Sequence, residues 1–198
     1  MSNMNKAKHR IFIAINLPKE VKDYLAKFEK KRFNWPVRWT KPENLHITLV
    51  FVGYVGDVEL EKIKEITKQV VCNYREFDVV LEKICPGPIN ARPRMIWVLG
   101  KRNDYLSQLK EELENALISS SEIPYNRKEN REFFVHITLA RARGFSKIPA
   151  VDVKLNIEFK VNSIEIMESK LLPTGAEYNV VELFELSKIP NSSTSNIQ

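Results

Sequence analysis

Residues Glu43–Gly53 read ENLHITLVFVG, and residues Glu132–Arg143 read EFFVHITLARAR. The tetrapeptide His-Ile-Thr-Leu therefore occurs twice in a chain that has only 3 histidines. Two buried strands can share aliphatic residues by chance, but a histidine and a threonine repeated inside them are harder to explain in that way. The repeat indicates two copies of one structural unit, each presenting the same polar pair.

Strand and helix signals also repeat around the two motifs. A short apolar run, a helix with one apolar face and the motif strand occur in this order in residues 10–52 and again in residues 94–140. One helix is expected to begin at Pro18, and Asp57 and Asp104 are expected to cap two others. The expected strands are residues 10–17, 45–52, 77–84, 94–99, 133–140, 156–167 and 178–186, with turns at 39–42, at CPGP (85–88) and at LPTG (172–175).

The arrangement of these elements predicts an α+β fold, because several neighbouring strands can pair as antiparallel hairpins. No linker rich in Gly or Ser separates the halves, so we expect two lobes packed together rather than two free domains. Residues 1–190 are expected to form one bilobal domain in which each lobe contributes one HITL motif. Residues 191–198 are polar and are expected to form a flexible tail.

Composition narrows the class of protein. The chain has 198 residues, of which 43% are hydrophobic and 28% charged, as in an ordinary globular protein with a real core. Its formal charge of +6 favours a phosphate-bearing partner. The N-terminal sequence resembles neither a signal peptide nor a membrane span. Cys72 and Cys85 do not form a C-x-x-C pair and are interpreted as reduced thiols. We therefore expect a cytoplasmic protein that does not bind membranes.

The motif itself suggests its chemistry. Residues two apart on a strand face the same way, so His46 projects with Thr48, and His136 projects with Thr138. If a pseudo-two-fold axis relates the lobes, the two pairs face each other across a cleft. Two imidazoles suit a reaction that needs one general acid and one general base near neutral pH, and threonine hydroxyls can donate to phosphate oxygens. The pattern favours acid–base phosphoester chemistry without a metal.

Two other interpretations of the motifs compete with this one. A single HITL motif is more often a strand with a satisfied histidine, but the matched surroundings of both motifs disfavour that interpretation here. Two histidines are also good metal ligands. However, no Asp, Glu, Cys or further His lies within four residues on the motif face, and Thr is a poor ligand. We therefore expect no metal and no cofactor. His9 lies in the polar N-terminal segment and is expected to be solvated.

At these residues the chain resembles the two-histidine (2H) phosphoesterase superfamily, which is defined by two H-x-[ST]-x motifs. More narrowly, it is similar to the bacterial and archaeal RNA 2',3'-cyclic phosphodiesterases, historically called 2'-5' RNA ligases. The resemblance covers nearly the whole chain. It is carried by RIFIAINLP, NLHITLVFVG, RMIWVLG, FVHITLAR and SIEIMESKLLPTGAEYNVVELFEL.

The resemblance implies a bilobal α+β fold of two pseudo-symmetric lobes of antiparallel sheet, with helices outside and a central cleft. The implied activity is hydrolysis of a terminal ribonucleoside 2',3'-cyclic phosphate to a 2'-phosphate. By the same resemblance His46 is the proton donor to the departing 3' oxygen, and His136 is the proton acceptor that activates water. Thr48 and Thr138 hold the phosphate.

Arg141 follows His136 by five residues and matches an arginine common after the second motif in this family. Strict alternation places Arg141 on the opposite face of the strand from His136. It can bind the phosphate only if the strand bulges or ends by Ala140.

Further contacts to RNA are less clear from the sequence. Trp39, Phe133 and Phe134 are possible stacking platforms for a terminal base, with core packing as the alternative. Basic residues that flank the motif strands could contact a phosphate backbone, although such charges are more often solvated; they are Arg38, Arg92, Arg94, Arg127, Lys128 and Arg131.

Two rival functions stay open. The same site could join RNA halves through a 2'-5' linkage, and a non-catalytic module could bind RNA ends without turnover. Intact His and Thr in both motifs favour catalysis over binding alone. The expected partners are RNA ends or cyclic nucleotides as substrates, with no obligate protein partner, and we expect a monomer.

Overall fold

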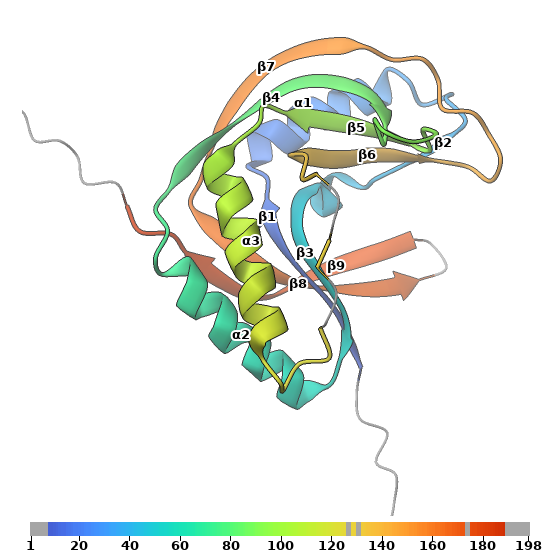
Figure 1. The fold of residues 1–198 in the computed structure, drawn as a ribbon. Coiled ribbons are helices and arrows are strands. Elements are labelled where there is room, and N and C mark those ends of the chain that lie inside the picture. Colours follow the sequence, from blue (N-terminus) through green and yellow to red (C-terminus); the bar gives the residue numbers. More distant parts are fainter. Residues whose placement is uncertain (1–7, 126–127, 130–131, 173–174, 189–198) are drawn as a thin grey trace, which may run out of the picture.

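The computed structural model describes residues 8–125, 128–129, 132–172 and 175–188. Within these residues the chain forms one strongly curved, mostly antiparallel sheet and three α-helices (Figure 1). The helices are α1 (Lys19–Lys30), α2 (Asp57–Val71) and α3 (Asp104–Ser119), with a 3₁₀ turn, η1, at Pro42–Asn44. The strands are β1 (His9–Asn16), β2 (Val37–Trp39), β3 (His46–Val55), β4 (Phe77–Gly87), β5 (Met95–Gly100), β6 (His136–Ala142), β7 (Val153–Val161), β8 (Ser163–Leu172) and β9 (Gly175–Glu185).

The sheet consists of two halves that meet at the motif strands. Its order is β7-β4-β5-β6-β3-β1-β8-β9, and β2 pairs with β6 beside this path. β3 and β6 are joined by a single residue pair, Ile47 with Ile137. Each half therefore has four strands along this path, with its HITL strand at the junction. The α+β prediction is confirmed.

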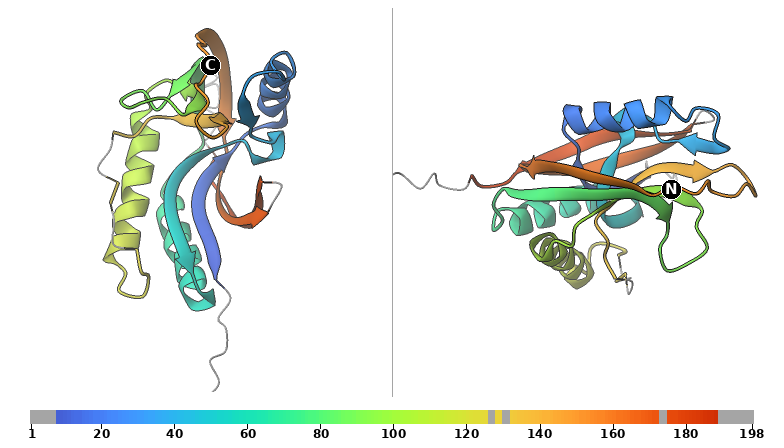
Figure 2. Two further views of the ribbon diagram at one scale, coloured as in Figure 1. Left: turned by 90° about the vertical axis from the view of Figure 1, so that its right-hand side faces the viewer. Right: turned by 90° about the horizontal axis from the view of Figure 1, so that it is seen from above.

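Helix packing follows the apolar spacing of the sequence. Val21, Leu25 and Phe28 of α1 are buried in the same core as Leu106 and Leu109 of α3. Viewed from above, α1 lies on one side of the strands, whereas α2 and α3 lie on the other (Figure 2). Helices therefore lie on both sides of the strands.

All three predicted helix starts were wrong by one residue. Pro18 precedes α1 as its N-cap instead of beginning the helix. Asp57 and Asp104 are the first residues of α2 and α3, and the N-caps are Gly56 and Asn103. Asn103 caps α3 because its side-chain oxygen accepts a hydrogen bond of 2.9 Å from the backbone amide three residues later. The carboxylates of Asp57 and Asp104 still stabilise these two helices, because each lies in the first turn, near the positive end of the helix dipole.

Several predicted strand bounds need correction. Residues 156–167 are not one strand, because β7 ends at Val161 and β8 begins at Ser163. The 39–42 turn instead spans the end of β2 and the start of η1, and β6 begins at His136 rather than at residue 133. β4 continues through the expected CPGP breaker to residue 87. Pro86 is tolerated there because the pairing of β4 with β7 ends at Ile84, so no hydrogen bond toward β7 is needed from the proline.

The half of the sheet that carries the second motif is one continuous stretch of chain. It contains β4 to β7, and its first residue, Phe77, pairs directly with its last, Val161. β1, β3, β8 and β9 of the other half come from both sides of this stretch. The chain crosses back at Asn162, whose carbonyl oxygen accepts a hydrogen bond from the Leu186 amide at 2.8 Å.

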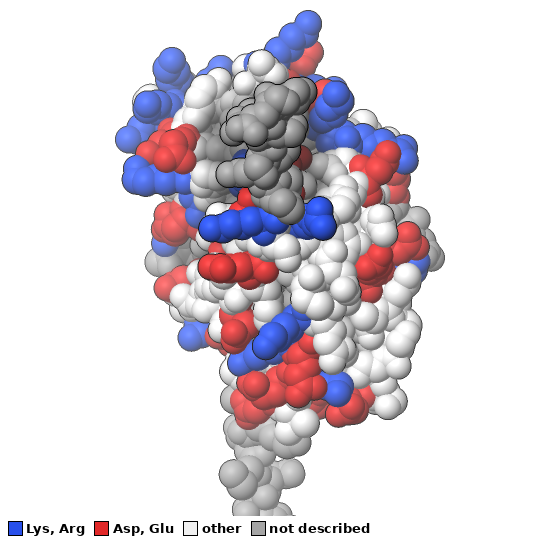
Figure 3. All heavy atoms as spheres, turned by 90° about the vertical axis from the view of Figure 1, so that its left-hand side faces the viewer, with Lys and Arg blue, Asp and Glu red and all other residues white. Residues whose placement is uncertain are grey.

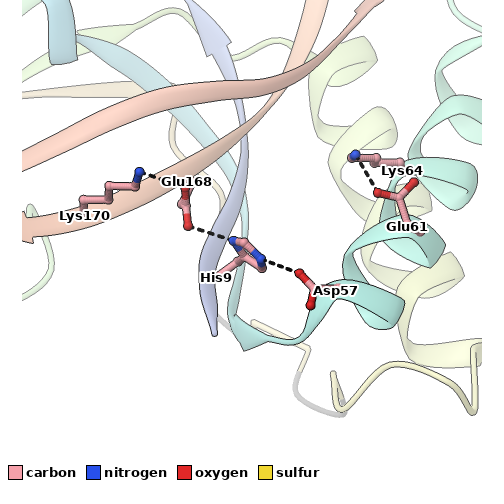
Figure 4. A network of polar contacts seen from close by, with 6 residues as sticks. All are labelled: His9, Asp57, Glu61, Lys64, Glu168 and Lys170. Atoms are coloured by element: carbon pink, nitrogen blue, oxygen red, sulfur yellow. Dashed lines mark hydrogen bonds and ion pairs between the residues drawn. The ribbon is translucent and has the colours of Figure 1, made fainter. Parts of the chain in front are cut away.

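His9 is not merely solvated, as the sequence suggested, but joins three elements (Figure 4). Its Nδ1 lies 2.9 Å from Glu168 Oε1 on β8, and its Nε2 lies 2.9 Å from Asp57 Oδ1 at the start of α2. These two hydrogen bonds to carboxylates raise the pKa of His9. The network fastens the first strand to α2 and β8.

Two further expectations concern the thiols and the membrane. Cys72 is exposed and Cys85 is buried, and both are free. Among the described residues, no helix has the length and apolar character needed to span a membrane. The expected tail, residues 191–198, and part of the LPTG turn lie outside the described residues.

Candidate active site

The two motif strands share one local irregularity. Thr48 pairs with Ala14 and Val50 with Ile13, so β3 contains one extra residue, Leu49, relative to β1. In β6, the pairing with β5 likewise skips one residue, Leu139, directly after the motif threonine. A bulge of this kind shifts the alternation by one position. Both strands therefore change face immediately after the motif.

The bulge decides where Arg141 lies. Without it, Arg141 would face the core behind His136; with it, Arg141 returns to the motif face and lines the cavity there. The matching position on β3 is Phe51, which is 67% exposed and lines the same cavity. The two halves thus present an arginine and an aromatic ring from equivalent positions.

A single cavity brings the predicted residues together. Its volume is about 1060 Å³, which is ample for a nucleotide. Because β3 and β6 run antiparallel through Ile47 and Ile137, His46 lies toward Thr138 and His136 lies toward Thr48. The cavity is lined by both motif pairs and by the two residues that follow the bulges: His46, Thr48, His136, Thr138, Phe51 and Arg141.

The two imidazoles are held in the same way. His46 Nδ1 lies 2.7 Å from the Asn44 carbonyl oxygen, and His136 Nδ1 lies 2.8 Å from the Phe134 carbonyl oxygen. A carbonyl can only accept, so Nδ1 carries the proton in both neutral rings and Nε2 is the free base. Nε2 of His46 lies 2.9 Å from Thr48 Oγ1, whose hydroxyl donates to it.

Aromatic side chains form the walls behind the histidines. Phe12 and Tyr178 have ring centroids 4.9 Å and 5.2 Å from that of His46. Trp97 lies 4.2 Å from the ring of the second motif histidine. Trp97 is in turn packed on Gly87, where any Cβ would collide with the indole. These contacts limit ring motion and remove water from the histidines.

Burial controls the charge of both histidines. It lowers the pKa of His46 to about 4, against the hydrogen bond to the Asn44 carbonyl, which raises it; the charges of His136 and Arg141 lower it further. The pKa of His136 is also lowered, mainly by burial. Both rings are therefore neutral near pH 7.

The remaining sequence candidates divide into two groups. The first group, Phe133, Phe134 and Arg38, lines the cavity. The second group lies elsewhere. Trp39 packs against the core and stacks on Trp35, with ring centroids 6.0 Å apart. Lys128 is paired with Glu111, and Arg92 and Arg94 are exposed and are not among the residues that line the cavity. Arg127 and Arg131 lie outside the described residues.

Sequence reasoning missed Phe51, Phe12 and Tyr178. β1 is apolar on both faces, so no alternation marked Phe12 as facing His46. Phe51 could be assigned to the cavity only with knowledge of the bulge at Leu49 in β3. Tyr178 reaches His46 from the far end of the chain, through the β1–β8 and β8–β9 pairings.

The charge of the molecule is not gathered on its helical side. On the face seen from the left of Figure 1, basic and acidic side chains lie intermixed (Figure 3). Arg10, Arg38 and Arg141 line the cavity on another part of the surface. Among the described residues, no group of three or more His, Cys, Asp or Glu side chains is arranged to hold a metal ion.

Comparisons with known proteins place the chain in a family. Residues 13–97 match the family model of the LigT-like phosphoesterases. A Thermotoga maritima protein named RNA 2',3'-cyclic phosphodiesterase is 30% identical over 181 residues, 87% of this chain and 92% of its own length. An Aeropyrum pernix protein of the same name is 33% identical and covers 74% of this chain and 84% of its own length. The chain belongs to the LigT-like phosphoesterase family.

Solved structures extend the comparison to the fold. A Thermus thermophilus protein superposes with a TM-score of 0.77 and 27% identity, covering 90% of this chain and 98% of the other. E. coli LigT in complex with 3'-AMP superposes with a TM-score of 0.75 at 24% identity, covering 91% and 99%. The predicted α+β architecture is therefore that of its relatives.

Proposed function

We propose that this protein hydrolyses the 2',3'-cyclic phosphate at the end of an RNA to a 2'-phosphate, using two histidines as acid and base. The relatives named RNA 2',3'-cyclic phosphodiesterase support this activity, at identities from 23% to 33%. The observation that carries it is the pair of neutral imidazoles, each with Nδ1 fixed on a carbonyl and each lining one cavity.

In the proposed reaction, water attacks phosphorus while the bond between phosphorus and the 3' oxygen breaks. Nε2 of His136 accepts the proton from water. Nε2 of His46 gives its proton to the departing 3' oxygen, and the product keeps the phosphate on the 2' oxygen. The two protons balance, so the enzyme returns to its starting state once a proton passes back from His136 to His46 through solvent.

The low pKa of His46 must be reconciled with its role as proton donor. At a pKa of about 4, almost no molecules carry a second proton on this ring near pH 7, and Nε2 is unprotonated. The substrate is an anion, and a negative charge beside a buried imidazole raises its pKa. His46 is therefore charged together with substrate binding, whereas His136 is already the neutral base.

Thr48, Thr138 and Arg141 are proposed to bind the non-bridging phosphate oxygens. The Thr48 hydroxyl donates to the unprotonated Nε2 of His46. When that nitrogen becomes protonated, the hydroxyl is released to donate to a phosphate oxygen instead. Arg141 contributes a guanidinium that has no carboxylate partner among the described residues; its side chain contacts Met95 Sδ at 3.0 Å.

The family resemblance assigns donor and acceptor, and the near-symmetry of the two histidines leaves the reverse assignment chemically reasonable. Phe51 is proposed to stack on the terminal base, because it is exposed and lines the same cavity as the motif pairs. The proposed cytoplasmic location and monomeric state follow from the sequence expectations.

Purified protein treated with EDTA and incubated with an oligoribonucleotide ending in a 2',3'-cyclic phosphate provides the test. Formation of a 2'-phosphate end, and not a 3'-phosphate, is the expected result. Activity that returns only with added metal would refute the acid–base scheme. Binding without turnover would favour the RNA-end module. Joining of a second RNA with a 5'-hydroxyl would reveal the 2'-5' ligation reaction at the same site.

A further inference from the structure

Arg38 lines the cavity, but the proposed reaction assigns it no role. It is the central residue of β2 and pairs directly with Arg141 of β6. Directly opposite residues of an antiparallel pair project to the same face, and both arginines line the cavity. Two arginine side chains therefore extend from neighbouring strands into one cavity, with the guanidinium of Arg141 against Met95 of β5.

The short strand β2 holds Arg38 firmly. Val37 on one side of it is fully buried, and Trp39 on the other side packs against the core. The backbone amide of Thr40 then donates to the Leu139 carbonyl at 2.9 Å. Because alternation turns Val37 and Trp39 inward, it turns Arg38 outward into the cavity, where its side chain is exposed.

The pairing of two arginines costs free energy unless an anion lies between or beside them. Like charges directly opposite on a sheet are destabilising. Neither Arg38 nor Arg141 forms an ion pair with a carboxylate within the described part of the chain. The acidic residues of the cavity, Glu129 and Glu132, precede β6, whereas Arg141 lies near its other end.

The charge of the reacting group does not require both arginines. A cyclic phosphodiester carries one negative charge, and Arg141, two threonines and two histidines already face it in the proposed complex. A second guanidinium on a strand with a held backbone matches a second phosphate one nucleotide away. A nucleoside 2',3'-cyclic phosphate lacks that group, and an RNA chain supplies it.

We propose that Arg38 binds the phosphodiester on the 5' side of the terminal nucleotide, so that the ends of RNA chains are better substrates than free cyclic nucleotides. This inference rests on the proposed function. In the antiparallel register through Ile47 and Ile137, His46, the proposed donor to the 3' oxygen of the ribose, lies level with Thr138, at the end of the motif that continues toward Arg141. The sugar and the chain attached to it thus lie on the Arg38 side.

The test compares a nucleoside 2',3'-cyclic phosphate with a ten-nucleotide RNA ending in the same group, for the unchanged protein and for Arg38→Gln. The ratio of kcat/KM for the oligomer to that for the mononucleotide is expected to fall about five- to tenfold in Arg38→Gln. The slope of log kcat/KM for the oligomer against log salt concentration should also become shallower by about 0.7. Arg38→Lys should restore most of this slope, because it keeps the charge.

Arg75→Gln is the matched control, since Arg75 is exposed and lies outside the cavity lining. It removes the same charge and should leave the ratio unchanged. Equal losses for both substrates in Arg38→Gln would overturn the inference, as would an unchanged ratio.

Failure of the proposed function would be visible separately, because neither substrate would be hydrolysed by the unchanged protein. The role of Arg38 would then be decided by fluorescence anisotropy with a labelled oligomer ending in a 2'-phosphate. Weaker binding by Arg38→Gln than by Arg75→Gln supports the phosphate contact, and equal binding refutes it.

Discussion

Phe51 and Arg141 occupy equivalent positions in the two halves of the sheet. Each follows its motif histidine by five residues, and each is turned toward the cavity by one extra residue in its strand. The backbone repeats, but the side chains do not. A cyclic phosphate at the end of a nucleoside is itself asymmetric, with an aromatic base at one end and an anion at the other, and this pair of residues offers one partner to each.

Replacing Phe51 by Ala should raise KM for a nucleoside 2',3'-cyclic phosphate. Base stacking on an aromatic side chain contributes about 1–3 kcal/mol, so the increase should be roughly ten- to hundredfold. Phe51 is 67% exposed, and the thermal midpoint should therefore change little. Steady-state kinetics with Phe51→Tyr as the conservative variant provide the check, and an unchanged KM in Phe51→Ala would remove the ring from the site.

Replacing either motif histidine should remove turnover while leaving the fold intact. His46→Asn and His136→Asn should each lower kcat by about 10²- to 10⁴-fold, because each removes one proton-transfer group. His9→Asn is the matched control, since the third histidine lies in the network with Asp57 and Glu168. Full activity in one motif variant would exclude that histidine from the mechanism.

Substrate-like anions should change the titration of His46. In the unliganded protein its midpoint, measured from the imidazole proton shifts by NMR, should lie near a pKa of about 4, because burial opposes the charge. Saturating inorganic phosphate should move the midpoint upward. A midpoint near 6.5 that phosphate does not shift would contradict the coupling between binding and protonation.

The same burial makes stability depend on pH. The folded pKa of His46 is below its unfolded value, so the unfolded chain binds more protons as the pH falls from about 6.5 toward 4. The free energy of unfolding should therefore decrease over this range. Urea titrations at pH 7 and pH 5 should show a smaller decrease for His46→Asn than for the unchanged protein.

The network around His9 should make the free energy of unfolding depend on pH in the opposite direction to His46. Its folded pKa is raised, so its stabilising contribution is complete below the unfolded value near 6.5 and is lost as the pH rises through the folded pKa. His9→Gln should lower the free energy of unfolding by up to about 1 kcal/mol at pH 6. The difference should shrink at pH 9, and an equal difference at both pH values would refute an electrostatic origin.

Gly87 should not tolerate a side chain. In Gly87→Ala the new methyl group would collide with the indole of Trp97, which packs on His136. Both kcat and the thermal midpoint should fall. Adding Trp97→Leu to Gly87→Ala should recover part of the midpoint by making room for the methyl group; no recovery would mean that the glycine is needed for another reason.

The motif pairs could be predicted from the sequence because period-two alternation is a local property of a strand. His46, Thr48, His136 and Thr138 all line the cavity. Arg141 was placed only conditionally, since no Gly or Pro marks the bulge in β6. The repeated burial pattern around both motifs now shows that the bulge belongs to the repeated unit.

Other parts of the site depend on pairing between strands that are distant in the sequence, so they could not be predicted from the local sequence pattern. Tyr178 faces His46 only because β9 pairs with β8 and β8 with β1. Trp39 was a candidate for base stacking, but the neighbouring Trp35 and Phe28 provide an aromatic cluster that holds it in the core. The break between β7 and β8 had a local signal that was overlooked, because the adjacent turn-favouring residues Asn162 and Ser163 lie at it.

The pairing of Phe77 with Val161 has a consequence for protein engineering and for how such chains can evolve. The segment between them enters and leaves the molecule at neighbouring points, and it carries one His-Thr pair on its own hydrogen-bonded strands. An exchange of this segment between relatives therefore has to match the Ile47–Ile137 junction, the pairing of β2 with β6 and the helix contacts. In this architecture, one continuous segment of the chain carries one of the two His-Thr pairs of the candidate active site.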